Sequence, residues 1–340
     1  MKRAKIQDIA DLLNISRVTV WKVFNNKEGV SEDMRRKVLE CAAELNFQPS
    51  KLQEAGFSFP LKKQTLVSVV VSRPETSVFW MKIIHQLAEE FSNTGIGLMY
   101  TYLPAEIPDG YILPQSLMDG SIQGIIIMNV YDKTALSLLN ELSLPKVFLD
   151  IVADMTIESL NGDILLLEGR DSIKEIVTSL ANKGHKRIGF IGDIQYAKTN
   201  MERYEGYVSA MYQMGIPIEP NICYTGNMTV KTYVEIIEEF MNNIEQLPDA
   251  FVCVNDHAAN MLVQYLESHG YRVPEDVAVS GYDDNNEFIY TKNLTTVQVN
   301  NSQIAKRLAK QLLYRIDNLE DPYEITYIRT KVIFRNSTSM

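Results

Sequence analysis

The sequence contains few of the residue types that build reactive centres. Its three cysteines are odd in number and lack the spacing of metal ligands: Cys41, Cys223 and Cys253. This argues against both a disulfide framework and a zinc site. The four histidines are scattered with no nucleophile at motif spacing, and the stretch GFIGDIQ lacks the G-x-G-x-x-G pattern of a dinucleotide site. We therefore predict no catalytic residues, no metal and no cofactor, and expect that the chain is not an enzyme.

Long apolar runs and targeting signals are also missing. No apolar run approaches the length of a transmembrane helix, and no signal-peptide pattern precedes the first helical segment. With 46% hydrophobic residues, the composition is that of a globular protein, which we expect to be cytoplasmic and without a membrane partner. A chain of 340 residues is too long for one simple core, so several domains are expected.

What the sequence does contain, at its start, is a pattern for three short helices. In the first, apolar residues recur at i, i+3, i+4 and i+7, namely Ile6, Ile9, Ala10 and Leu13. Ser16 is a good N-cap for a second helix starting near Arg17, because its hydroxyl can accept from free amides of the next turn. Ser31 caps a third helix whose apolar positions are Val38, Leu39, Ala42 and Leu45. These helices are expected to close a small core.

The second helix has the side chains of a helix that reads DNA. Its apolar face is predicted to turn inward with Val20, Val23 and Phe24, which leaves outward or at the rim Arg17, Val18, Trp21, Lys22 and Asn25. Basic, polar and apolar groups at a helix N-terminus suit base edges in a major groove. Contacts to phosphates are expected from Ser16, Thr19 and Asn25, and the predicted DNA-binding set also includes Ser31.

The charge of this segment favours DNA binding over the alternative, a helical cap with a solvated face. Residues 1–27 hold six Lys or Arg and two Asp, although the whole chain has a formal net charge of −10. An acidic protein binds DNA through a segregated basic patch rather than through its bulk charge. We therefore predict a helix-turn-helix headpiece over residues 1–48 and a hinge or linker over 49–63.

From residue 64 onward, short β-branched runs alternate with amphipathic helices. Strands are predicted at LVSVVV, IGLMYTYL, IQGIIIMN and KVFLDIV, and again at RIGFIG, ICYTG, AFVCVN and VAVSGYD. Such runs, bounded by Gly and Pro, indicate parallel sheets. Two blocks of similar size predict an α/β fold with two doubly wound lobes and a ligand crevice at the carboxyl ends of the strands.

The C-terminal segment is expected to cross back to the first lobe, with a last strand near Tyr327 to Phe334. The predicted effector-binding and dimerisation domain therefore spans 64–340. Lobe 1 takes about 64–168 plus 300–326, and lobe 2 takes about 169–299 plus 327–340.

At this point the residues show a family resemblance. The string KIQDIADLLNISRVTVWKVFNNKEGVSEDMRRKVLECAAELNFQP resembles the DNA-binding headpiece of the lactose/galactose repressor family, LacI/GalR. Further strings resemble that family's effector domain in order and spacing: GHKRIGFIG, ERYEGY, VNDHAA, VSGYDD and NLTTV. The resemblance covers nearly the whole chain. It implies a homodimer that binds a palindromic double-stranded DNA operator, and a second domain that resembles periplasmic sugar-binding proteins.

Several candidate effector contacts lie where strands of the first lobe end. Phe79 and Trp80 form an aromatic pair that suits stacking on a sugar or a purine ring; the alternative is that both begin the core face of the next helix. Asp150 ends a strand, where a buried carboxylate needs partners, so it either accepts ligand hydroxyls or caps the next turn. Arg73 follows the first strand and touches either the ligand or the lobe interface.

The second lobe supplies the other candidates. Arg203 matches the family's effector-contacting arginine and offers forked donors to vicinal hydroxyls or a carboxylate; the alternative is a salt link with a neighbouring glutamate, Glu202 or Glu205. Asn255 and Asp283 end strands and suit sugar hydroxyls. Asp256 is expected to contact ligand or only to cap the helix that begins at His257.

Two departures from the family pattern affect the headpiece and its hinge. Trp21 stands where the family usually has Ser. Gly56 stands where relatives insert a Leu into the minor groove, and Gln53 stands at the position of a small Ala, so minor-groove bending is not carried over to this chain. A third departure, SLNGDILLLEGRDS, replaces the family's usual short connection into the second lobe.

The sequence therefore predicts a sequence-specific DNA-binding transcription regulator, most simply a repressor. Its operator affinity is expected to be controlled by a small effector in the inter-lobe cleft, a sugar or sugar derivative. The alternatives are control by a protein co-regulator or by a non-sugar metabolite such as a purine, and, remotely, an α/β enzyme with an accessory helical domain.

Overall fold

The structure, a computed structural model, describes residues 6–24, 27–45, 47, 65–72, 78–228, 233–285 and 289–340. It divides into two compact units, Met1–Thr65 and Leu66–Met340.

The first unit is the expected three-helix headpiece. Its helices are α1 Ile6–Leu12, α2 Arg17–Phe24 and α3 Glu32–Glu44. Their apolar faces meet in one core built from Ile9, Ala10, Val20, Val23, Phe24, Val38, Cys41 and Ala42. The predicted cap of the third helix is confirmed, because Ser31 Oγ accepts from Met34 N at 3.3 Å.

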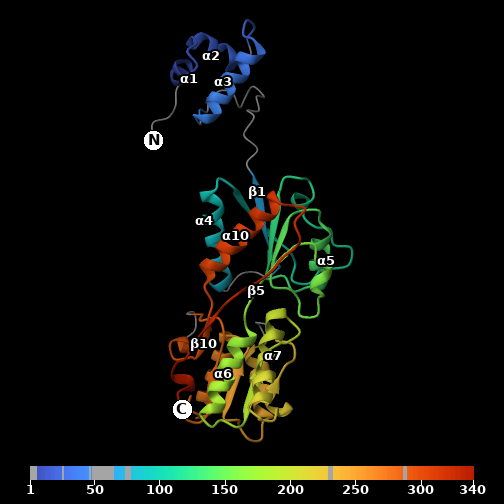
Figure 1. The fold of residues 1–340 in the computed structure, drawn as a ribbon, viewed down its shortest axis with the longest axis vertical. Helices are drawn as coiled ribbons and strands as arrows, with labels where there is room; N and C mark the ends of the chain where they lie inside the picture. Colours follow the sequence, from blue (N-terminus) through green and yellow to red (C-terminus); the bar gives the residue numbers. More distant parts are fainter. Residues whose placement is uncertain are drawn as a thin grey trace. The chain divides into compact units, whose positions relative to one another are not determined.

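The second unit begins with a six-stranded sheet in the order β11-β5-β4-β3-β1-β2, in which neighbouring strands pair in parallel. Its strands are β1 Leu66–Val71, β2 Gly97–Tyr102, β3 Gly124–Met128, β4 Lys146–Leu149, β5 Asp163–Leu167 and β11 Ile325–Ile328. One face is covered by α4 Val78–Asn93 and α10 Asn301–Asp317, the other by α5 Lys133–Glu141 (Figure 1).

A four-stranded parallel sheet in the order β7-β6-β8-β9 forms the second lobe. Its strands are β6 Ile188–Ile191, β7 Cys223–Tyr224, β8 Ala250–Cys253 and β9 Ala278–Ser280. One face packs against α6 Arg170–Asn182 and α7 Lys198–Gln213, and the other against α8 Tyr233–Asn242 and α9 Asp256–Ser268. An antiparallel pair adjoins it, β10 Thr296–Gln298 with β12 Lys331–Ile333.

Short 3-10 turns complete the described elements: Gln115–Leu117, Ile157–Ser159, Pro220–Ile222, Ile289–Lys292 and Asn336–Thr338. The chain passes between the two lobes three times, after β5, after β10 and after β11. The α/β class with two doubly wound lobes is confirmed.

Two details of the lobes differ from the sequence expectation. The altered connection SLNGDILLLEGRDS contains β5, a buried strand with neighbours on both sides; its run of apolar residues has no alternation because both faces are covered. The expected last strand near 327–334 is instead two short strands, β11 and β12, which belong to different sheets. The boundary expected at residue 326 therefore falls after Ile328, because β11 pairs with β5.

A buried ion pair fastens the returning helix to the first sheet. Arg315 on α10 donates through Nη2 to Asp163 Oδ1 at 2.8 Å and through Nε to Oδ2 at 3.1 Å, and both side chains are at most 2% exposed. Gln311 Nε2 and the Glu324 amide donate to the same carboxylate, each at 2.8 Å. Since the remaining Arg315 donors reach backbone carbonyls, the buried charges are fully hydrogen-bonded.

Candidate DNA-reading helix and effector cleft

Helix α2 presents one buried and one exposed face, as predicted. Val20, Val23 and Phe24 are at most 4% exposed, whereas Val18 is 61% and Trp21 47% exposed. Arg17 is also exposed and Lys22 partly so. This geometry fits base reading by the outward set, which stays a prediction; Asn25 lies outside the described residues.

The ends of α2 are held by contacts local to the headpiece. Ser16 Oγ accepts from Thr19 N at 3.0 Å and lies 2.9 Å from Thr19 Oγ1, so both hydroxyls gather at the helix start. At the other end, Arg35 of α3 donates to Val23 O at 3.3 Å and to Lys27 O at 3.0 Å. A basic side chain on the last carbonyls stabilises a helix end. This role of Arg35 could not be predicted from the sequence, because it depends on how α3 packs against α2.

Arg203 is one of two residues in the described part of the chain with a buried side-chain polar atom that lacks a hydrogen-bond partner. It projects from α7, is 5% exposed, and donates through Nη1 to Val254 O at 2.8 Å. Its Cζ lies 3.5 Å from the centre of the Tyr282 ring. Its Nε is buried without a hydrogen-bond partner among the described residues. Leaving such a donor unpaired costs free energy, so the arrangement is typical of a group that serves a ligand.

The alternative of a salt link from Arg203 to a neighbouring glutamate is not what the structure shows. Glu202 accepts from Tyr327 Oη at 2.7 Å, and Glu205 pairs with Arg170. Within the described part of the chain, no ion pair joins Arg203 to either. The guanidinium instead lies in electrostatic reach of two carboxylates, Asp150 and Asp283.

Asp283 faces Arg203 from the end of β9. Burial raises the pKa of its carboxyl to about 6, and the nearby guanidinium opposes that rise. Its φ of 114° lies in a region that non-glycine residues rarely adopt, and its amide donates to Val297 O at 3.0 Å. Backbone strain of this kind often persists at ligand sites. The predicted pair of Arg203 and Asp283 is therefore brought together by the fold.

Asp150 is occupied by contacts that join the two lobes. Its carboxylate accepts from Thr199 Oγ1 at 2.5 Å, from Thr199 N at 3.3 Å and from its neighbour Ile151 N at 2.8 Å. The N-cap of α7, Ala197, has no side-chain oxygen, so Asp150 of the first lobe supplies it. The rings of Tyr131 and Tyr196 pack beside it in a tilted arrangement, with ring centres 4.2 Å apart and an angle of 41° between the ring planes. Asp150 thus caps a helix in the other lobe rather than its own next turn.

The cap of α9 comes from Asn255, not from Asp256, for which capping was one of the two expected roles. Asn255 is the N-cap of α9, with Oδ1 accepting from Ala258 N at 2.8 Å. Asp256 is fully buried and accepts from Thr296 Oγ1 at 2.7 Å and from Asn285 N at 2.8 Å. Burial, and then the charge of Asp283, raise its pKa to about 8. Capping needs an oxygen one residue before the helix, which is where Asn255 stands; the amide Nδ2 of Asn255 is 3.3 Å from Tyr233 Oη.

Phe79 borders a cavity, and Trp80 packs inward. The two rings lie edge to face, with centres 5.1 Å apart, and both pack on the core of the first lobe. A cavity of about 310 Å³ is lined by Phe79 and Lys82 of α4, by the carboxyl-end residues Asp283 and Asp284, and by polar residues that include Gln298 and Asn301. Trp80 packs against the core of the first lobe, which agrees with the alternative that it begins the core face of the helix. Arg73 lies outside the described residues.

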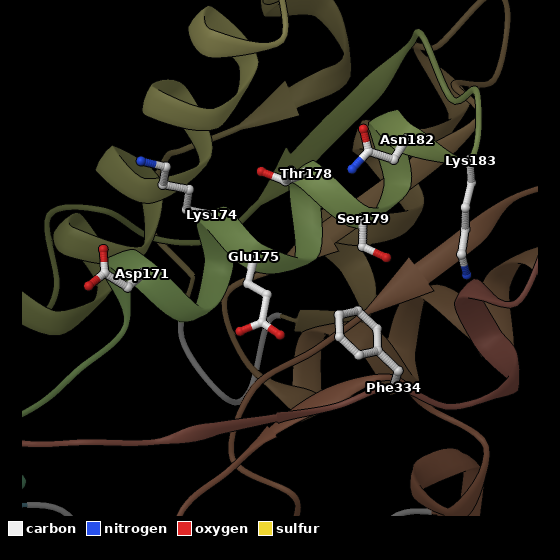
Figure 2. Close-up of a pocket in the computed structure, with 8 residues that line it drawn as sticks. All are labelled: Asp171, Lys174, Glu175, Thr178, Ser179, Asn182, Lys183 and Phe334. Carbon is white, nitrogen blue, oxygen red and sulfur yellow. The ribbon is translucent and has the colours of Figure 1, made fainter.

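A larger hollow, of about 690 Å³, lies elsewhere on the second lobe. Figure 2 shows its side chains along one face of α6, with Phe334 beside them; the lining residues are Asp171, Lys174, Glu175, Thr178, Ser179, Asn182, Lys183 and Phe334. Among the described residues, two buried side-chain atoms have no hydrogen-bond partner, Arg203 Nε and Ser280 Oγ, and neither lines this hollow. The chemistry of a ligand site therefore gathers around Arg203.

Two residues that contact the predicted site residues were not predicted from the sequence. Thr199 donates to Asp150, and the ring of Tyr282 lies against the guanidinium of Arg203. Thr199 sits two residues after an alanine N-cap, a pattern that leaves a helix start in need of an outside acceptor. Tyr282 stands inside the string VSGYDD next to Asp283, but nothing in the sequence says which ring an arginine will stack on.

Comparisons with known proteins agree with this division of the chain. Residues 5–50 match the family described as bacterial regulatory proteins, lacI family, and residues 177–338 match the periplasmic binding protein-like domain. The HTH-type transcriptional repressor PurR of Pasteurella multocida (strain Pm70) is 27% identical over 337 residues, 98% of each chain.

Two solved structures are similar over nearly the whole chain. The transcriptional regulator CelR–cellobiose complex has a TM-score of 0.69 at 21% identity, covering 98% of this chain and 100% of that one. The lac repressor dimer bound to operator and the anti-inducer ONPF has a TM-score of 0.70 at 20% identity, covering 99% of each. At this level of identity, both likenesses concern the fold.

The fold and the site define a class: transcriptional regulators that join a helix-turn-helix headpiece to a periplasmic-binding-protein-like domain. Within that class, residues 5–50 match the family described as bacterial regulatory proteins, lacI family, and the chain is similar over 98% of its length to an HTH-type transcriptional repressor named PurR. Its relatives are regulators of transcription. In the described part of the chain, none of the helices combines the length and apolar character needed to span a bilayer.

Proposed function

We propose that this chain is a repressor whose operator affinity is controlled by a sugar or sugar derivative bound between its lobes. The observation that carries the proposal is Arg203, buried beside Asp150 and Asp283 with Nε unpartnered and no direct ion pair to either carboxylate. A hydroxyl group both donates and accepts, so vicinal hydroxyls satisfy a forked guanidinium and a carboxylate at once.

The cavity lined by Asp283 supplies the apolar part of such a site. Phe79 gives an aromatic edge and Val299 an aliphatic one, and the rest of the lining consists of amides, carboxylates and Lys82. Sugar sites combine a few placed polar groups with an apolar surface. The cellobiose complex of the structural relative CelR supports this ligand class. A purine is the second candidate, favoured by the same aromatic ring.

The proposal extends to the partners of the chain. We propose a homodimer that binds a palindromic operator through α2 of each headpiece, in the cytoplasm, with domains near 1–48, 49–63 and 64–340. The lac repressor dimer on its operator supports this geometry. The predicted base readers are Arg17, Val18 and Lys22, with phosphate contacts from Ser16, Thr19 and Asn25, and the predicted DNA-binding set also includes Trp21 and Ser31. The predicted effector contacts are Phe79, Trp80, Asp150, Arg203, Asn255, Asp283 and Arg73.

The test has two stages and uses the full chain. Selection of bound DNA from a random pool should return a palindrome, which then serves as the operator. A thermal-shift panel of cellobiose, D-ribose, sugar phosphates and purine bases should identify a compound that stabilises the protein and changes its affinity for that operator. If no compound does so, a protein co-regulator takes the place of the small effector; turnover of a bound compound would indicate an enzyme instead.

Arg203→Ala should keep operator binding and lose the response to the compound. The matched control is Arg170→Ala, since Arg170 is exposed at the start of α6 and pairs with Glu205 on the surface. A full response in Arg203→Ala contradicts the proposed site.

A further inference from the structure

The side chain of Arg203 runs between two walls. On one side is the backbone of Gly169: a Cβ added there would stand 2.7 Å from Arg203 Cγ and 3.3 Å from Nε. On the other side is the buried Tyr282 ring, 3.5 Å from the guanidinium carbon. Gly169 has φ −131°, a conformation open to any residue, so the space for the arginine is what a larger side chain at this position would remove.

Both walls connect to the first crossover between the lobes. Glu168 and Gly169 are the first two residues after β5, and Tyr282 Oη donates to Glu168 O at 2.5 Å. Thr330 Oγ1, in the crossover after β11, donates to the same carbonyl at 3.0 Å. The Glu168 carboxylate in turn accepts from Asp171 N at 2.5 Å and so caps α6. The carbonyl of Glu168 in the first crossover therefore accepts hydrogen bonds both from the crossover after β11 and from the tyrosine that lies against Arg203.

We propose that Gly169 and Tyr282 are positioning residues that orient Arg203 and tie its position to the crossover between the lobes. The inference rests on the proposed function, because it makes Arg203 the group that meets the effector. Only one donor, Nη1, is fixed by a backbone carbonyl, so ring stacking and the glycine surface set where the others point.

This arrangement couples ligand and lobe geometry in both directions. Hinge motion between two lobes is absorbed by a few residues of the connecting segments. Bending at Glu168 and Gly169 moves both walls and with them the guanidinium. By linkage, a ligand that holds the guanidinium favours one bend of the crossover.

The first experiment needs no ligand. Thermal midpoints are measured for the full chain, Gly169→Ala, Arg203→Ala and the double variant. We expect Gly169→Ala to lower the midpoint when Arg203 is present and to be silent or slightly stabilising without it, because the crowded Cγ is gone. Gly124→Ala is the matched control: its added Cβ would meet Leu312 Cδ1 at 2.9 Å, far from the arginine in sequence and lobe. An equal effect of Gly169→Ala in both backgrounds overturns the proposal.

The second experiment measures binding of cellobiose and of D-ribose by calorimetry, and the effect of each on affinity for the selected operator. Gly169→Ala should weaken sugar binding about tenfold and Gly124→Ala should not. Tyr282→Leu should also lose sugar affinity, because the stacking surface is removed. Tyr282→Phe should keep sugar affinity and reduce the sugar's effect on operator affinity about fivefold, the value of one hydrogen bond.

The two proposals fail in different ways. If the unaltered chain binds neither sugar, the proposed ligand class fails, and the thermal cycle alone decides the positioning role. If the chain binds a sugar and Tyr282→Leu binds it equally well, the positioning role fails while the ligand class stands.

Discussion

The headpiece and the cleft achieve placement of their functional side chains by different means. In the headpiece, Ser16 and Thr19 are three residues apart, and the outward residues of α2 are exposed whatever surrounds the helix. In the cleft, Asp150 and Thr199 are 49 residues apart, and Glu168 and Tyr282 are 114 apart. A DNA-reading helix needs only local order, whereas an enclosed ligand site needs segments that are distant in sequence to meet. Substitutions in the two regions should therefore be detected by different measurements.

The largest expected effect is on the stability of the second unit. Asp163→Ala leaves Arg315 buried without its carboxylate, which typically costs about 3–5 kcal/mol. The two tryptophans separate the units: Trp21 lies in the headpiece and Trp80 in the first lobe. In a Trp21→Phe background, denaturation followed by Trp80 fluorescence should show the lower stability of Asp163→Ala. In a Trp80→Phe background, denaturation followed by Trp21 fluorescence should show no change in the headpiece.

The control for this comparison lies in the headpiece. Asp33 forms exposed ion pairs with Arg36 at 2.7 Å and Lys37 at 2.8 Å. Such pairs contribute little in water. Asp33→Ala should therefore leave the Trp21 transition nearly unchanged, and a loss as large as that of Asp163→Ala would erase the distinction between the two regions.

The next largest effect is a pH dependence confined to the second unit. Burial raises the pKa of Asp256 to about 8 from an ordinary 3.8, so folding favours the protonated carboxyl. The stability from this group is then present at low pH and is lost as pH rises between those values, by about 1.4 kcal/mol per pH unit within the window.

Denaturation at pH 5 and pH 8, followed by Trp80, measures this slope. Asp256→Asn should reduce it, because the amide does not titrate, and should leave the part contributed by Asp283, whose pKa burial raises to about 6. Asp276→Asn should leave the slope unchanged, since the hydrogen bond from Arg272 lowers the pKa of that carboxyl to about 2. An unchanged slope in Asp256→Asn would assign the pH dependence to another group.

A smaller effect is expected in base discrimination by the headpiece. Arg17→Ala should relax preference at one operator position by about 1–3 kcal/mol if the arginine makes a bidentate base contact. Titration of the selected operator and of single-base variants measures this. A loss that is equal for every sequence would instead indicate a phosphate contact.

The smallest expected effect concerns the cap of α3. Ser31→Ala removes the acceptor for Met34 N and should cost about 1 kcal/mol of headpiece stability. The Trp21 transition should report it and the Trp80 transition should not. Ser31→Asp keeps an acceptor at the cap and should restore the wild-type value; failure to do so would argue against capping as the source of the effect.

Much of the fold was predictable because its signals are local. Helical spacing and two capping serines located the headpiece helices, and β-branched runs located strands of both sheets. Strand β5, DILLL, was not predicted, because a strand covered on both faces has no alternation of apolar and polar residues to distinguish it from other apolar segments.

The candidate site was predictable only in part. Arg203 and Asp283 were singled out by strand ends and motif resemblance, and the fold brings them together. The roles of Asp150, Asn255 and Asp256 were not, because a carboxylate at a strand end reads the same whether it faces a ligand, caps a distant helix or accepts from a buried threonine.

By itself, the sequence determined the helix-turn-helix with its exposed Arg17 and Val18, the alternation of strands and helices, and the positions of candidate polar residues. Those features follow from side-chain periodicity and capping within a few residues. The tertiary structure alone decided which partners these residues meet: Thr199 for Asp150, Tyr282 and Gly169 for Arg203, and Asp163 for Arg315. Burial makes each of those pairings costly to leave unsatisfied, and burial is set only once the two lobes have closed around their crossovers.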